Sequence, residues 1–439
     1  MGSLWRHHGR VTPPRAGQNP RGRPTQRRAS QGHDREVVDI EGLAAGGDGI
    51  GHLCDGRVVF GEGALPGERV VLDIVASKKD FARGVAVEVL DASPLRIVPP
   101  CPHLGRGCGG CTWQHVRPVD QPDLKAMIVR DALRRIAKLP AVPVGTAPIY
   151  RGHVPPVGYR TSVRLAVSDD GRPAYRQRHS HRLVPVGSCD VSHPLLAELI
   201  ADARFPGAGS VGLRVSAMTG ERMASPDRLQ GPARVPAGTA VTAPGGNASI
   251  TEEVGRRRWR ISSASFFQSG PAAAELLSAS VLALAGGDAG PGARIVDLYA
   301  GVGLLGGVVM DATGAHELVA VESNAAAVAD ARVNLAGLRA TVVAAEVAGF
   351  HTDGHPDLVV ADPARSGLGR SAARAVAALG APTVLVVSCD PASLARDAVL
   401  LGHFGYALEA VEVVDLFPNT FHTETVSRFT TSEKRRPAG

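Results

Sequence analysis

Two patterns of hydrophobic positions divide this chain into regions. From about residue 266, short apolar runs alternate with alanine-rich segments whose apolar residues recur with helical spacing. Apolar runs bounded in this way are typical of buried parallel strands. The expected strands are Arg294–Leu298, Glu317–Val321, Thr341–Ala345, Asp357–Ala361 and Thr383–Val387. The alternation predicts an α/β fold, with a doubly wound Rossmann-like domain over residues 266–439.

Residues 36–95 show the other pattern, in which short apolar segments are separated by glycines. Four of these segments are Val37–Ile40, Val58–Phe60, Val70–Val75 and Gly84–Leu90. Glycines at such intervals are typical of tight turns between strands. About five short strands in so few residues predict a small closed barrel of the OB type.

The remaining residues form a tail and a central region. Residues 1–35 hold eight arginines and no apolar core, which predicts a disordered basic tail and argues against a secretory signal. Residues 96–265 are expected to form a central α+β domain. Its apparent elements are a helix over Gln121–Leu139 and strands over Ser162–Val167 and Arg182–Val186.

Composition narrows the class of protein. The chain of 439 residues is 44% hydrophobic, and we find no apolar stretch that would span a membrane. Six cysteines in so long a chain do not make a disulfide framework, so we expect a cytoplasmic protein. The net charge of +6 favours a polyanionic partner such as RNA. We expect a monomer.

Three cysteines, Cys101, Cys108 and Cys111, stand within eleven residues, with glycines between them. Glycines let the backbone fold round a small object, and thiolates at this density bind zinc or an iron–sulfur cluster. A fourth ligand is needed, and Cys189 fits better than Cys54. The spacing does not decide between the two metals. His103 is a further possible ligand.

The segment after the first expected strand carries the motif G-x-G-x-x-G, with glycines at 301, 303 and 306. Dinucleotide-binding enzymes carry the same motif, so the motif by itself does not identify the ligand. Asp297 at the strand end would repel a pyrophosphate, whereas the cationic part of S-adenosylmethionine tolerates a carboxylate. Glu322 ends the next strand, where a carboxylate can accept both ribose hydroxyls. Asp362 ends the fourth strand. These acids favour a methyltransferase over the alternative, a nicotinamide- or flavin-dependent oxidoreductase.

Cys389 follows the apolar run Thr383–Val387, at the strand end where open α/β sheets carry their chemistry. Glu424 begins a last expected strand after a turn at Pro418 and Asn419, so it should enter near the same edge. A thiol and a carboxylate together suit methylation of a pyrimidine at C5. Thiolate addition at C6 makes C5 nucleophilic, and a base then removes the C5 proton.

Together these residues resemble the RNA uracil-5-methyltransferase family, in the branch with an N-terminal TRAM barrel, over about residues 36–432. The resemblance implies a [4Fe-4S] cluster on Cys101, Cys108, Cys111 and Cys189, with zinc as the alternative. It implies Cys389 as nucleophile and Glu424 as the proton-abstracting base. It also implies S-adenosylmethionine contacts, at Gln268, Tyr299, Leu304, Glu322 and Asp362. Several positions depart from the family pattern, among them Ala364, Ser269 and Thr161–Ser162.

The sequence therefore predicts an enzyme that transfers a methyl group from S-adenosylmethionine to C5 of a uridine in RNA. We expect ribosomal RNA, specifically 23S rRNA, as the substrate, with transfer RNA as the alternative. A non-catalytic RNA-binding protein is a third possibility, against which the intact Cys389 and Glu424 argue.

Overall fold

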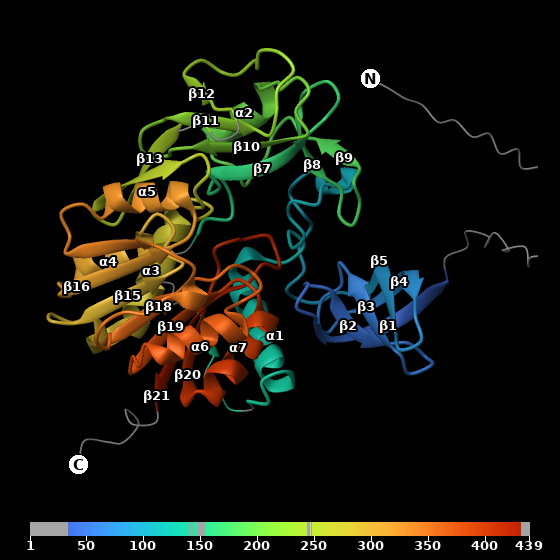
Figure 1. Ribbon diagram of the computed structural model, residues 1–439. Coiled ribbons are helices and arrows are strands. Elements are labelled where there is room, and N and C mark those ends of the chain that lie inside the picture. The colour runs from blue at the N-terminus through green and yellow to red at the C-terminus, as the bar shows by residue number, and fades with distance from the viewer. Residues whose placement is uncertain are drawn as a thin grey trace, which may run out of the picture.

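The computed structural model describes residues 34–139, 141, 144–146, 154–243, 246 and 248–431. Figure 1 shows a small β-barrel, a central sheet and a larger α/β layer arrangement. The predicted basic tail, apart from its last two residues, lies outside the described residues.

The barrel is closed and has five strands in the order β1-β2-β3-β5-β4. Their bounds are β1 Arg35–Leu43, β2 Gly49–His52, β3 Val58–Glu62, β4 Arg69–Ser77 and β5 Phe81–Asp91. Alternate residues point inward, so that Val38, Ile40, Val70 and Leu72 form the barrel core. The antiparallel pairing of β1 with β4 closes the barrel. The predicted closed barrel is confirmed.

The central sheet has six strands in the order β12-β11-β10-β7-β8-β9. Its strands are β7 Ser162–Val167, β8 Pro173–Arg176, β9 Leu183–Pro185, β10 Ser210–Val215, β11 Arg222–Pro226 and β12 Thr239–Val241. Helix α2, Pro194–Asp202, covers this sheet through Leu196, Leu199 and Ile200. The cysteine-rich segment follows the barrel and contains two short 3₁₀ turns, η1 Leu104–Arg106 and η2 Pro118–Asp120, the second of which ends where the next helix begins, at Gln121. A hairpin of β13, Ser249–Val254, and β14, Arg257–Ser262, follows the sheet.

The large sheet has eight strands in the order β17-β16-β15-β18-β19-β21-β20-β6. The first five are parallel: β15 Arg294–Leu298, β16 Glu317–Glu322, β17 Ala340–Ala344, β18 Leu358–Ala361 and β19 Thr383–Ser388. β21, Glu424–Thr431, runs antiparallel between β19 and β20, Tyr406–Val414. Successive strands are added on one side of β15 up to β17 and on its other side from β18 onward. Ligands bind at such switch points in open α/β sheets. The predicted doubly wound fold is confirmed.

Helices cover both faces of this sheet, and each face has its own hydrophobic cluster. One cluster holds residues of α3 Pro271–Ala285, α4 Leu304–Thr313 and α5 Ala325–Asn334. The other holds residues of α1 Gln121–Arg135, α6 Gly369–Ala378 and α7 Pro391–His403. The 3₁₀ turns η4, Gly286–Ala289, and η5, Val347–Gly349, complete the layers.

Two elements join the large sheet from far away in the sequence. α1 lies on the same face as α7, and β6, Val144–Thr146, pairs in parallel with β20 at the sheet edge. The sequence places both segments in the central region, because their hydrophobic pattern does not tell which sheet they join. In the structure they belong to the α/β layers.

Helix α3 with η4 is long and apolar enough, by length and composition, to cross a membrane. Its residues Leu276, Leu277 and Val281 are buried against the sheet. This contact identifies it as a core helix of the α/β layers.

Candidate active site

A cavity of about 610 Å³ lies at the carboxyl ends of the parallel strands. Every residue that the sequence singles out for catalysis or cofactor binding lines it: Gln268, Tyr299, Leu304, Glu322, Asp362, Cys389 and Glu424. They come from the ends of β15, β16, β18, β19 and β21 and from the segment before α3. The topology thus gathers residues separated by more than a hundred positions into one site.

The glycine loop after β15 shapes one side of the cavity. Gly301 and Gly303 adopt positive φ angles, and so does Tyr299, at +60°. Positive φ is uncommon outside glycine, and such strained residues cluster at functional sites. The Asp297 carboxylate accepts a hydrogen bond from the amide of Gly306 at 2.8 Å, which fixes the first turn of α4. Its other oxygen is buried without a partner among the described residues.

Glu322 organises the tip of the second strand. Its carboxylate accepts hydrogen bonds from the amides of Gly301 at 2.8 Å, Ser323 at 2.8 Å and Asn324 at 2.7 Å. Asn324 in turn caps α5 by accepting from the amides of Ala326 and Ala327. The carboxylate is therefore held in place before any ligand arrives.

Two carboxyl groups of the cavity are costly to ionise. Burial, reinforced by Asp362 and Glu322 nearby and opposed by the Gly306 amide, raises the pKa of Asp297 to about 7. Burial alone raises the pKa of Asp362 to about 7. A buried carboxylate without a paired cation is unfavourable. A cationic ligand in this cavity would supply the missing charge.

The thiol and the carboxyl predicted to carry chemistry lie on neighbouring strands. Cys389 follows β19 directly, and Asp390 caps α7 by accepting from the amide of Ser393 at 2.7 Å. Glu424 is the first residue of β21, and Ser388 of β19 pairs with Thr425. Burial, and then the nearby Glu424, raises the pKa of Cys389. Burial also raises the pKa of Glu424, which is 6% exposed, well above its ordinary value, and Asp362 adds to this.

Sequence reasoning did not single out Arg365, which lines the same cavity. Its positive charge and a hydrogen bond lower the pKa of Cys389, and its charge also lowers that of Glu424. Its guanidinium lies 3.4 Å from Nδ1 of His422. The signal available was its position, three residues after Asp362 at the tip of β18. Phe266, whose side chain is 70% exposed, also lines the cavity.

The four cysteines of the expected cluster line a second, smaller cavity together. Burial, and next the neighbouring Cys189 thiol, raises the pKa of Cys111 to about 12. His103 lines the same cavity, and its Nε2 lies 3.4 Å from the Ser188 hydroxyl. Cys54 is exposed in a barrel turn, away from the cavity.

The described residues include no group of three or more His, Cys, Asp or Glu side chains already positioned to hold a metal ion. The donor set of four thiols round one cavity nevertheless suits a thiophilic metal or an iron–sulfur cluster. Arg160 lines both this cavity and the larger one, so the two are neighbours.

Two protein families match parts of the chain. The TRAM domain matches residues 34–87, which are the barrel. The methyltransferase small domain matches residues 273–378, which contain the glycine loop and the tips of β15, β16 and β18.

Curated relatives span nearly the whole chain. An uncharacterized RNA methyltransferase of Streptomyces avermitilis is 35% identical over 424 residues, covering 89% of this chain and 96% of the relative. The 23S rRNA (uracil(1939)-C(5))-methyltransferase RlmD of Halomonas elongata is 32% identical, covering 91% of this chain and 90% of the relative.

A solved structure has the same fold. The crystal structure of the tRNA (uracil-54, C5)-methyltransferase of Pyrococcus abyssi in complex with S-adenosyl-L-homocysteine superposes with a TM-score of 0.67. It is 23% identical and covers 90% of this chain and all of that chain.

Proposed function

The chain belongs to the family of S-adenosylmethionine-dependent RNA uracil methyltransferases, and on that premise we propose that it methylates C5 of one uridine in 23S rRNA through a covalent bond to Cys389. The observation that carries this proposal is the shared cavity. It holds a thiol, a buried carboxyl and the acids of the strand tips within one space of about 610 Å³.

In the proposed reaction the Cys389 thiolate adds to C6 of the uracil, and the electrons of the C5=C6 bond move toward O4. C5 then attacks the methyl carbon of the cofactor, and S-adenosylhomocysteine leaves. The Glu424 carboxylate takes the proton from C5, the double bond reforms and the thiolate is released. Arg365 favours the first step, because its charge stabilises the thiolate form of Cys389.

The cofactor occupies the glycine-loop side of the cavity in this proposal. Glu322, already held by three amides, accepts the ribose hydroxyls, and Asp297 and Asp362 face the cationic methionine part. Gln268, Tyr299 and Leu304 complete the contacts. The target uridine must leave its stack to expose both C5 and C6, so it enters as a looped or flipped nucleotide.

The mechanism is tested with RNA and labelled S-adenosylmethionine. Cys389→Ala should reduce methyl transfer below about one thousandth of the wild-type rate. Glu424→Gln should accumulate a covalent RNA adduct, because the last proton cannot leave; the adduct is measured by its slow migration on a denaturing gel. Methyl transfer by Cys389→Ala at the wild-type rate would overturn the assigned nucleophile. Absence of the adduct would overturn the assigned base.

Ribosomal RNA is proposed because the relative from Halomonas elongata is named for 23S rRNA and matches at higher identity than the transfer RNA enzyme. Unmodified transcripts of 23S rRNA and of transfer RNA, offered in parallel, test this choice. Methylation confined to transfer RNA would replace the substrate and leave the mechanism standing.

We also propose a [4Fe-4S] cluster on Cys101, Cys108, Cys111 and Cys189. When bound it would tie the segment after the barrel, which carries Cys101, Cys108 and Cys111, to the loop after β9, which carries Cys189. Protein purified without oxygen should be brown and contain iron and acid-labile sulfide, and Cys111→Ser should lose both. A colourless protein containing zinc would identify the alternative metal.

A further inference from the structure

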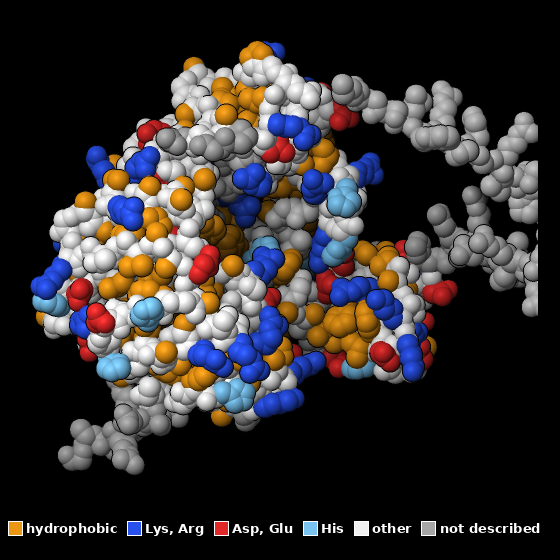
Figure 2. Space-filling model, viewed as in Figure 1, with side chains coloured by type: hydrophobic (Ala, Val, Ile, Leu, Met, Phe, Trp, Pro, Cys, Tyr) orange, Lys and Arg blue, Asp and Glu red, His pale blue; other side chains and the backbone are white. Residues whose placement is uncertain are grey.

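One face of the α/β layers carries a concentration of arginines. Helices α1, α6 and α7 expose six of them, and α7 adds a histidine at its end. We call this set the arginine face: Arg130, Arg134, Arg135, Arg370, Arg374, Arg396 and His403. Figure 2 shows Lys and Arg side chains gathered over the region where Figure 1 draws these helices side by side.

Acidic side chains on the same helices balance little of this charge. Asp397 of α7 is buried and accepts from the amides of Leu368 and Gly369. Asp131 pairs with Arg134 at 2.7 Å and with Arg135 at 2.9 Å, and Asp123 is exposed. Arg370 and Arg374 have no hydrogen bond or ion pair to any residue within the described ranges, and with His403 they line a hollow of about 370 Å³.

The arginine face begins at the reaction cavity. α7 starts two residues after Cys389, and its thirteen residues extend about 20 Å from there to His403. Arg396 of α7 donates to the hydroxyl of Ser393, in the first turn of that helix, at 2.8 Å. That hydroxyl donates to the carbonyl of Arg365, a cavity residue, at 2.7 Å. The row of charges thus leads directly away from the site of chemistry.

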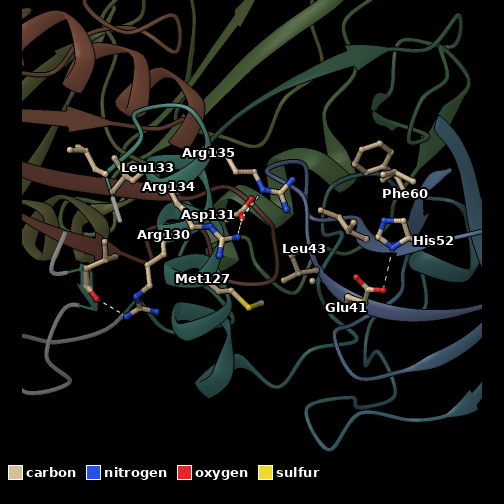
Figure 3. Close-up of a pocket in the computed structure, with 15 residues that line it drawn as sticks. Glu41, Leu43, His52, Phe60, Met127, Arg130, Asp131, Leu133, Arg134 and Arg135 are labelled. Carbon is tan, nitrogen blue, oxygen red and sulfur yellow. Dashed lines mark hydrogen bonds and ion pairs between the residues drawn. The ribbon is translucent and has the colours of Figure 1, made fainter. Parts of the chain in front are cut away.

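At its other end the arginine face borders a groove of about 600 Å³ between α1 and the barrel. Figure 3 shows Arg134, Arg135 and Met127 on the helix wall, with Phe60 and His52 on the barrel wall. The lining mixes aliphatic, aromatic and cationic side chains with two carboxylates: Glu41, 3.2 Å from Nδ1 of His52, and Asp131, which pairs with Arg134 and Arg135. Single-stranded nucleic acids are bound by such mixtures, in which bases contact apolar surfaces and phosphates contact cations.

We propose that the arginine face and this groove form a track for the phosphate backbone of the RNA substrate outside the reacting nucleotide. The inference rests on the proposed function, because it assigns the track to the same RNA that enters the cavity. A polyanion complements the six arginines, and the groove accepts an unstacked base at the end of the track.

The test measures how RNA affinity depends on salt. Wild type is compared with Arg370→Gln/Arg374→Gln, on α6 beside the end of α7, and with Arg134→Gln/Arg135→Gln, at the rim of the groove. The probe is a 23S rRNA transcript, bound in nitrocellulose filter assays at several salt concentrations. If each arginine neutralises one phosphate, each double variant should reduce the slope of log affinity against log salt by about 1.4. Affinity for S-adenosylhomocysteine should not change.

Arg332→Gln/Arg339→Gln is the matched control. It removes the same number of charges. Both arginines are exposed: Arg332 lies in α5, on the opposite face of the sheet, and Arg339 follows that helix. Its slope should equal that of wild type. Unchanged slopes in both test variants, or an equal loss in the control, would overturn the track.

Methyl transfer by wild type to the same transcript separates the two proposals. If wild type methylates the RNA and the slopes do not change, the track is wrong and the proposed function stands. If wild type methylates no RNA while the test variants still lose slope, the proposed function fails and the face remains an RNA-binding surface.

Discussion

At the scale of single residues, the reaction cavity holds a thiol and a carboxyl whose ionisation is unfavourable, and an arginine whose charge favours the ionisation of both. Burial raises the pKa values of Cys389 and Glu424; the nearby Glu424 adds to the first shift and Asp362 to the second, whereas Arg365 lowers both pKa values. In the proposed reaction, a thiol that attacks as thiolate beside a carboxylate that accepts a proton needs such a cation. Arg365 is therefore the side chain through which the activation of the nucleophile can be tested.

Arg365→Gln should raise the pKa of Cys389 further. The rate of alkylation by iodoacetamide, followed by mass spectrometry of the Cys389 peptide, should then reach its half-maximum at higher pH than in wild type. Arg365→Lys should restore part of the shift because it keeps the charge. Both variants are made with Cys54→Ser to remove the exposed thiol. Superimposable pH profiles for all three proteins would contradict the electrostatic role.

Asp297 predicts a pH dependence of stability in the cofactor-free protein. Its pKa is about 7 when folded, so between about pH 4 and pH 7 the folded state holds a proton that the unfolded state has lost. Stability from this group is therefore complete at low pH and is lost as pH rises through 7.

Asp297→Asn keeps an oxygen for the Gly306 amide and removes the titration. In urea unfolding, the excess of the variant's free energy of unfolding over that of wild type should be larger by about 2–3 kcal/mol at pH 8 than at pH 5. A difference that stays constant with pH would show that Asp297 ionises normally in the folded protein.

At the scale of elements, the third glycine of the loop motif lets α4 lie close to the sheet. A methyl group added at Gly306 would lie 2.8 Å from a buried methyl of Leu318 in β16 and 2.9 Å from the Asp297 carboxylate. Both neighbours are buried in the core and have little room to move. This position needs glycine because α4 packs on the strands with no room for a side chain between them.

Gly306→Ala should therefore lower the free energy of unfolding by about 1–2 kcal/mol, since an overpacking cost of about 1–3 kcal/mol exceeds the gain in helix propensity. Gly402→Ala is the matched control, because nothing lies within 4 Å of its added methyl group near the end of α7. It should be neutral or stabilising by up to about 1 kcal/mol. Thermal unfolding compares the two; equal effects would exclude a packing role for Gly306.

The elements also show what the sequence could predict. The five parallel strands lie within one residue of their expected starts, because buried runs between helical segments have a distinctive pattern. The pairing of β6 with β20 was missed, since three residues carry no periodicity and their partner lies more than 250 positions away. Arg365 was missed for a related reason: its effect depends on Cys389 and Glu424, which only the fold brings near.

At the scale of the whole molecule, α1 contacts the loop that precedes Glu424, far away in the sequence. The Lys125 ammonium, fully buried, donates to the Asp415 carboxylate at 2.6 Å and to the carbonyl of Phe417 at 3.2 Å. Gln121 accepts from the amide of Asn419 at 2.6 Å. These contacts span nearly 300 positions in the sequence, so the position of the Glu424 carboxyl depends on a helix outside the methyltransferase segment.

Lys125→Met should destabilise the protein by about 3–5 kcal/mol, because it leaves the Asp415 carboxylate without its cation in a largely buried position. Lys125 also lowers the pKa of Glu424, so the same variant should retain Glu424 protonated to higher pH and slow the release of the covalent RNA adduct.

Lys125→Met/Asp415→Leu should recover most of the stability, because a buried ion pair can be exchanged for apolar side chains at little cost. It should not recover the rate of adduct release, which depends on the lost charge. Urea unfolding and adduct decay, measured on both variants, separate the two effects; parallel recovery of stability and rate would mean that Lys125 acts on Glu424 through structure alone.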